Sequence, residues 1–91
     1  MDEDHIFLTD KTEQTTTRFV SFMGENQRFD LGITKSNRYK DKALVFEIQT
    51  GRFAIIGKEE LEEPHFLEHS FDLNEQDAED LKSFLVEAIH S

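Results

Sequence analysis

The sequence predicts an α+β domain: an antiparallel meander of four to five strands with one C-terminal helix packed on one face of the sheet. Three observations lead to this prediction. Apolar and polar residues alternate in several short segments before residue 57. Polar segments with turn-forming Gly, Asn or Asp separate them. From residue 75 onward, the apolar residues recur with the spacing of an amphipathic helix.

The strands are predicted from β-branched and aromatic runs and from alternation. Five segments qualify: residues 5–9, 18–23, 28–34, 44–49 and 52–56. The clearest is 28–34, in which Phe29, Leu31 and Ile33 share one side. Thr50 and Gly51 are interpreted as a two-residue hairpin turn into the last strand.

The end of the chain changes period. Residues 58–63 are predicted as a single helical turn that ends at Pro64. Residues 65–72 are interpreted as a loop or a short extended segment. A helix is predicted from Glu75, with Asn74 as its N-cap and acidic residues near the positive end of the helix dipole.

Length and composition define one domain and exclude several classes of protein. The chain has 91 residues, so residues 1–91 are expected to form a single folding unit. Nine Phe residues are enough for a core, and the absence of Cys excludes disulfides, thiol catalysis and thiolate-held metal. An acidic N-terminus and apolar runs of only four residues indicate neither a secretory signal nor a membrane span. A soluble, cytoplasmic protein is expected.

The second face of the sheet is predicted to be partly apolar. A helix of about 16 residues is roughly 24 Å long and covers only one side of a sheet. Nevertheless, four apolar residues occupy alternate strand positions that are expected to point away from the helix: Val20, Phe22, Val45 and Ile56. Either the sheet curls towards a barrel or a second subunit covers that face. We favour a homodimer.

Charge is unevenly distributed along the chain. The net charge is −10, which argues against general nucleic-acid binding. Residues 1–58 sum to zero, whereas residues 59–91 carry eleven acidic side chains and one basic one. A local basic stretch comprises Lys35, Arg38, Lys40 and Lys42. Either these are solvated surfaces, or the basic loop contacts an acidic surface on a second copy or on another protein.

Three predicted strands begin with Arg followed by Phe, at Arg18, Arg28 and Arg52. If each Phe points towards the helix, the arginines form a row on the opposite face. Such a row could bind an anionic ligand, a nucleotide or an acidic partner. The alternative is that the arginines pair with carboxylates across the sheet.

His65 and His69 are the only histidines with metal-like spacing. They would lie about 6 Å apart on a helix and roughly 13 Å apart on a strand. Because Pro64 precedes them, we interpret them as surface residues and predict no metal and no cofactor. The sequence contains no Gly-rich phosphate-binding motif, no nucleophile elbow and no zinc-protease motif, so a non-enzyme is expected. The alternative is a small enzyme with scattered catalytic residues.

Two stretches, 18–30 and 49–57, together with Leu61–Pro64 and the Phe71-Asp-Leu segment, resemble a small family of cytosolic Firmicutes proteins known as a domain of unknown function. The resemblance covers about residues 5–90. It implies a one-domain bacterial protein and no reaction, cofactor or catalytic residue.

The leading functional hypothesis is a non-catalytic, self-associating binding or regulatory module. Its second sheet face would form a subunit interface. Its surface for a partner would comprise Arg18, Arg28, Arg52 and the basic loop at residues 35–42. The alternative is a nucleic-acid-associated protein that uses the same arginines with exposed Phe side chains.

Overall fold

The computed structural model describes residues 6, 8, 9 and 12–90, apart from the side chain of His90. Four strands are followed by three helices: β1 (Thr16–Met23), β2 (Arg28–Lys35), β3 (Lys42–Glu47), β4 (Phe53–Gly57), α1 (Lys58–Glu62), α2 (Phe66–Phe71) and α3 (Glu75–His90). Every neighbouring pair of strands is antiparallel, in the order β1-β2-β3-β4. The α+β meander predicted from the sequence is therefore confirmed.

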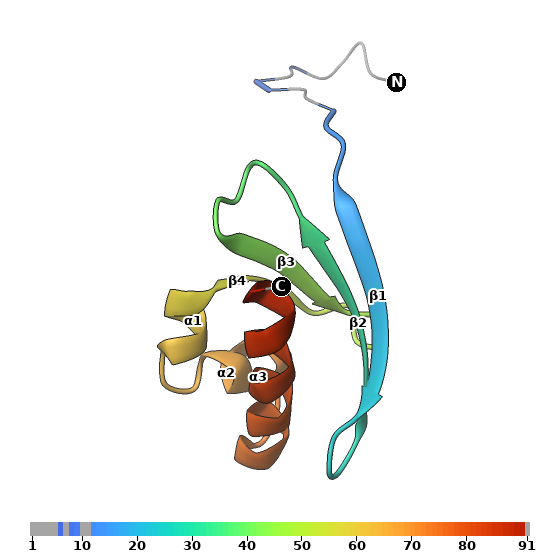
Figure 1. Ribbon diagram of the computed structural model, residues 1–91, viewed down its shortest axis with the longest axis vertical. Coiled ribbons are helices and arrows are strands. Elements are labelled where there is room, and N and C mark those ends of the chain that lie inside the picture. Colours follow the sequence, from blue (N-terminus) through green and yellow to red (C-terminus); the bar gives the residue numbers. More distant parts are fainter. Residues whose placement is uncertain (1–5, 7, 10–11, 91) are drawn as a thin grey trace.

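All three helices lie on the same side of the sheet, and none of the described residues forms a helix on the other side (Figure 1). The core lies between these two layers. Phe29, Leu31 and Val45 contribute from the central strands, while Leu81 and Leu85 contribute from α3, and all five are almost completely buried. The molecule is thus a two-layer domain with one covered and one open sheet face.

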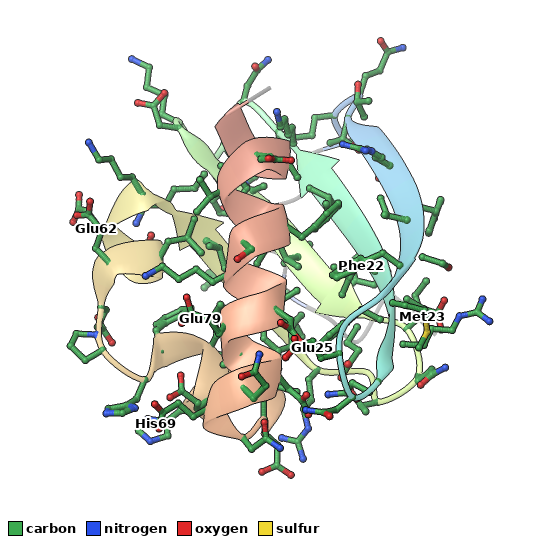
Figure 2. The ribbon with its side chains drawn as sticks, turned by 60° about the horizontal axis from the view of Figure 1, so that its bottom comes forward. Phe22, Met23, Glu25, Glu62, His69 and Glu79 are labelled. Carbon is green, nitrogen blue, oxygen red and sulfur yellow. The ribbon has the colours of Figure 1, made fainter. Side chains whose placement is uncertain are left out.

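The outer strand β1 joins this core through aromatic stacking. Phe22 points towards α3, and Met23 points away from it (Figure 2). The ring centroid of Phe22 lies 4.5 Å from that of Phe84 on α3 and 5.1 Å from that of Phe29 on β2. Burial alternates along the last residues of β1 for this reason.

The start of α3 is fixed as the sequence predicts. The side chain of Asn74 accepts a hydrogen bond of 2.8 Å from the backbone N–H of Asp77, which is an N-cap. The Asp77 carboxylate in turn accepts a 2.9 Å bond from Gln27, and Asp80 accepts one from the backbone N–H of Glu25. These bonds attach the β1–β2 turn to the first turns of α3.

Two local predictions are wrong. Residues 66–71 form α2 rather than a loop or extended segment, and this helix is bounded by His65 and Asp72, both in the left-handed region with φ of 63° and 54°. The β3–β4 connection comprises residues 48–52 rather than a two-residue turn. It is closed by the Glu47 N–H donating to the Arg52 carbonyl at 2.8 Å, and Gly51 supplies the positive φ.

The predicted strand at residues 5–9 is not seen in the part that the structure describes. Ile6, Leu8 and Thr9 have no strand pairing, and His5 and Phe7 lie outside the described residues. Among the helices that the structure describes, none combines the length and the apolar character needed to cross a membrane.

Candidate functional site: the open face of the sheet

Strand register places an aromatic row across the open face. Phe19 on β1 is paired with Gly32 on β2, Gly32 with Phe46 on β3, and Phe46 with Phe53 on β4. Cross-strand partners lie on the same face of a sheet, so all four positions share the side without helices. Phe19 is 69% exposed and Phe53 is 65% exposed, which is unusual for side chains of this size.

Gly32 makes the row possible. The Phe46 ring lies directly over it, and a Cβ atom at Gly32 would come within 2.1 Å of the ring. From there Phe46 reaches Phe19 edge-on, with ring centroids 6.3 Å apart. The absence of a side chain on β2 therefore lets β1 and β3 share an aromatic contact across the strand between them.

A second row lies beside the aromatic one. Thr17, Thr34, Leu44 and Ile55 are cross-strand neighbours on the open face. The Thr17 and Thr34 hydroxyls are 2.7 Å apart and form a hydrogen bond. Leu44 and Ile55 extend the apolar surface over β3 and β4, next to Phe46 and Phe53.

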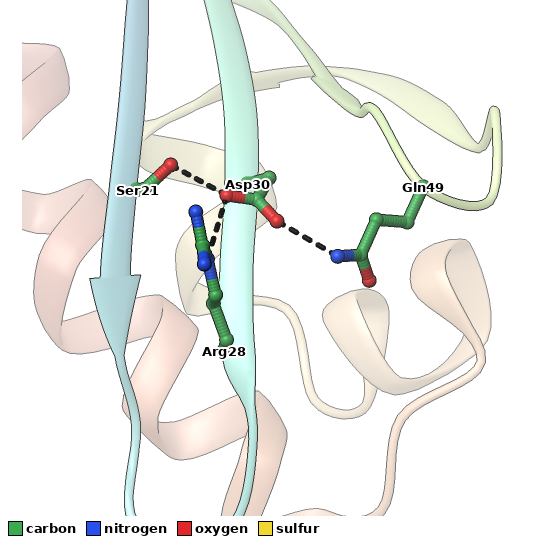
Figure 3. Close-up of polar contacts among 4 residues, drawn as sticks. All are labelled: Ser21, Arg28, Asp30 and Gln49. Carbon is green, nitrogen blue, oxygen red and sulfur yellow. Dashed lines mark hydrogen bonds and ion pairs between the residues drawn. The ribbon is translucent and has the colours of Figure 1, made fainter.

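On the other side of the aromatic row lies a small polar cluster (Figure 3). Asp30 accepts hydrogen bonds from Ser21 at 2.5 Å, from Arg28 at 3.1 Å and from Gln49 at 2.8 Å. The Ser21 hydrogen bond is the largest cause that lowers the pKa of Asp30 below its ordinary value. Asp30 is the only carboxylate among the strand residues of this face, and Arg28 is paired with it.

The arginines that the sequence suggested as a row do not come together. Arg18 lies on the covered face, with its guanidinium 5.9 Å from the ring centroid of Phe84. Arg28 lies on the open face. Arg52 pairs with Asp72, at the end of α2, at 3.7 Å.

The row was predicted on the assumption that every Phe after an Arg points towards the helix. This is wrong for Phe19 and Phe53, which point to the open face, and right for Phe29, which is buried.

The apolar character of the second face was predicted from Val20, Phe22, Val45 and Ile56, but these lie on the covered face. The open face is apolar because residues at the other alternate positions, such as Leu44 and Phe46, point to it. Their alternation can be assigned to this face only when the strand register is known.

The basic stretch lies at the β2–β3 end of the sheet. Lys42 makes a 2.6 Å ion pair with Glu60 of α1, which raises the pKa of Lys42 and lowers that of Glu60. Lys35 donates to the Ile89 carbonyl near the end of α3 at 3.5 Å. Lys35, Lys40 and Lys42 line a pocket of about 560 Å³, and Arg38 is not among its lining residues.

The two histidines adopt helical spacing. The ring centroids of His65 and His69 are 6.4 Å apart, and His65 is 2.8 Å from Glu68. This contact raises the pKa of His65 and lowers that of Glu68. Within residues 6, 8, 9 and 12–90, no three His, Cys, Asp or Glu side chains are grouped as metal ligands.

Charge is separated between the two layers. Residues 12–57, which contain the sheet, carry seven basic and five acidic side chains. Residues 58–90, which contain the helices, carry two basic and eleven acidic side chains. The open face is therefore on the layer with a charge near +2, and the layer with a charge near −9 lies behind it.

These features define a two-layer α+β domain whose exposed surface of interest is the open sheet face, with its aromatic row, rather than a deep polar cleft. The chain belongs to the SAV0927-like family, an uncharacterised family whose model matches residues 8–87. No curated protein matches it.

Proposed function

We propose that this protein is a non-catalytic, self-associating binding module, and that the open sheet face is its contact surface for a second copy. The observation that carries the proposal is the aromatic row, with Phe19 and Phe53 largely exposed at its two ends. We further propose that it acts in the cytoplasm of a Firmicutes bacterium, in keeping with the family resemblance and with a chain that contains no Cys.

The size of the open face suits a second copy. Most of the large hydrophobic residues that the structure leaves exposed belong to the sheet or its loops: Phe19, Met23, Ile48, Phe53 and Ile55. Four strands spaced about 4.8 Å apart and five to eight residues long present a face of roughly 20 by 25 Å at its longest. Stacking two such faces would bury on the order of 1,000 Å² in total, the lower end of specific interfaces.

The separation of charge favours the same geometry. Two copies that meet through their sheets keep the acidic helix layers on the outside of the pair. Any arrangement that brings two helix layers together would set two strongly negative surfaces against each other. The ion pair between Arg28 and Asp30 leaves the approaching faces close to neutral.

The test is the molar mass in solution, measured by light scattering after size exclusion, for the unmodified chain and for Phe53→Thr. Threonine keeps β propensity and removes the exposed ring. Because each pair of copies loses two rings, at about 1.5 kcal/mol each, the dissociation constant should rise roughly 100-fold.

Val86→Thr is the matched control, since Val86 is an apolar side chain that is 41% exposed on α3, in the other layer. It should leave the mass unchanged. A monomer at every concentration for the unmodified chain, or equal effects of the two variants, would refute the proposal.

A second candidate function is supported by the same row. Phenylalanine rings exposed on a sheet face can stack on the bases of single-stranded nucleic acid. The charges oppose it, because Arg18 and Arg52 are engaged in the helix layer and the net charge is −10. Fluorescence anisotropy with a labelled single strand at low salt tests it: salt-sensitive binding that Phe53→Thr weakens would favour nucleic acid over a second copy.

A further inference from the structure

Within the part of the chain that the structure describes, no strand pairs with the outer edge of β1. β1 is the first strand in the sheet order and runs for eight residues, Thr16–Met23. Figure 1 shows no other element beside its outer edge. Among the described residues, its only backbone ladder is the one with β2. Outward N–H and C=O groups of such an edge are a template for pairing with another strand.

The two edge strands of the sheet, β1 and β4, differ in how far other elements cover them. β4, at the other edge, has five residues and runs directly into α1, which packs against it together with α2. β1 has no Pro, no Lys and no bulge, since its register with β2 is unbroken from Thr16↔Lys35 to Met23↔Arg28. Its one charged side chain, Arg18, is directed at the Phe84 ring on the covered side. The usual devices that protect an edge strand are thus weak here.

We propose that β1 pairs antiparallel with β1 of a second copy, so that two four-stranded sheets become one continuous eight-stranded sheet. The proposal goes beyond the stacking of open faces, because it uses the backbone edge of the sheet and a different symmetry axis. The axis here is perpendicular to the sheet, and each copy contributes the same strand.

The sequence of β1 is self-complementary when the centre of symmetry is at Phe19. Residues that lie directly opposite each other on two antiparallel strands point to the same face of the sheet. The twofold axis must therefore relate one residue of β1 to the same residue of the second copy, and cannot pass between two successive residues. With the centre at Phe19, the two Phe19 rings face each other, and Thr17 faces Ser21 of the second copy. Aromatic pairs and hydroxyl pairs are favourable across antiparallel strands. With the centre at Val20, Phe19 would instead face a serine.

This register also extends the aromatic row. Phe53, Phe46 and Phe19 of one copy would continue into Phe19, Phe46 and Phe53 of the second copy at the same level. The open face would then be doubled in width and still be accessible. Edge pairing and face stacking can therefore act together, and an assembly of four chains would use both.

The experiment is a charge-pair swap at the two hydroxyl positions. The double variant Thr17→Lys with Ser21→Lys sets lysines opposite each other in the proposed register, and edge pairing should be lost. The double variant Thr17→Glu with Ser21→Lys (the Lys/Glu variant) sets Glu opposite Lys and should restore it, and both double variants then carry the same substitution opposite Asp30. Within one chain these positions lie about 13 Å apart, so the restored pairing would come from contact between copies.

Thr34→Lys is the matched control, because Thr34 is the hydrogen-bonded neighbour of Thr17 on the same face but lies on the internal strand β2. It should disturb face stacking and leave edge pairing intact. The molar mass of each variant is compared at equal concentration, with circular dichroism as the check on folding. If the Lys/Glu variant is folded and as dissociated as the Lys/Lys variant, the register is refuted.

Hydrogen–deuterium exchange of the unmodified chain separates this proposal from the proposed function. Edge pairing should protect alternate amides within residues 16–22 at high concentration and release them on dilution. Face stacking alone would leave these amides in fast exchange at every concentration, even where the mass shows a dimer. That outcome would overturn the edge proposal and keep the proposed function.

Discussion

At the scale of single residues, Gly32 has the sharpest steric requirement. A methyl group there would lie 2.1–2.6 Å from three atoms of the Phe46 ring. Gly32→Ala should therefore displace the ring and lower the free energy of unfolding by about 1–3 kcal/mol, although alanine is the better strand former. Urea denaturation measures this cost. Combined with Phe46→Leu, the cost of Gly32→Ala should shrink, and equal costs in both backgrounds would contradict the steric argument.

His65 and Glu68 give the protein a pH dependence of defined sign. The contact with Glu68 raises the folded-state pKa of His65 above 6.5, so its stabilisation is complete below pH 6.5 and is lost as the pH rises through the raised value. The pKa of Glu68 is lowered from 4.5, so its share is complete above pH 4.5 and is lost as the pH falls through the lowered value.

The pair should therefore contribute most between pH 4.5 and 6.5. The Tm of the unmodified chain minus that of His65→Gln should be largest in that window and decline on either side. Glu68→Gln should show the same window, and a difference that stays constant from pH 4 to 8.5 would contradict the ion pair.

Residue identity alone did not reveal which face each side chain occupies. Arg18-Phe19 and Arg28-Phe29 are the same dipeptide, yet Phe19 is on the open face and Phe29 is in the core. Alternation assigns neighbours to opposite faces, but the choice of face depends on how strands pair. Which face is covered depends on contacts between residues far apart in the sequence, such as that of Phe22 with Phe84.

At the scale of elements, α3 depends on its first turn. Asn74→Ala would remove the cap from the Asp77 N–H and loosen the carboxylate that holds the β1–β2 turn. The free energy of unfolding should fall by about 1 kcal/mol. Asn74→Asp, which keeps an acceptor, should recover most of it, measured by denaturation at neutral pH; a larger loss for Asn74→Asp than for Asn74→Ala would contradict the capping role.

The predictability of the elements follows from how local their signals are. Four strands and α3 could be predicted because alternation, helical spacing and the Asn74 cap can be recognised within short stretches of the sequence. Helix α2 could not, because its six residues are too few to show a period and its ends rest on left-handed conformations at His65 and Asp72. The length of the β3–β4 loop was missed because Gly51 fits several turn types.

At the scale of the whole molecule, the two layers carry opposite charge, and this predicts how salt affects association. Contact between two apolar sheet faces is insensitive to salt, while repulsion between the outer acidic layers is screened by it. The association constant should therefore stay level or rise between 50 and 500 mM NaCl, as measured by sedimentation equilibrium. An association constant that falls with salt would instead implicate the basic loop at residues 35–42 and the acidic helices.

The separation of charge between the layers also gives the molecule an electric dipole directed across the sheet. Near a cationic surface, such as an anion-exchange matrix or a positively charged sensor chip, the helix layer should turn towards the surface. The aromatic row would then face the solvent in every adsorbed molecule. Simple adsorption would thus present the sheet face in one orientation, without a tag or a chemical linkage, ready for binding measurements.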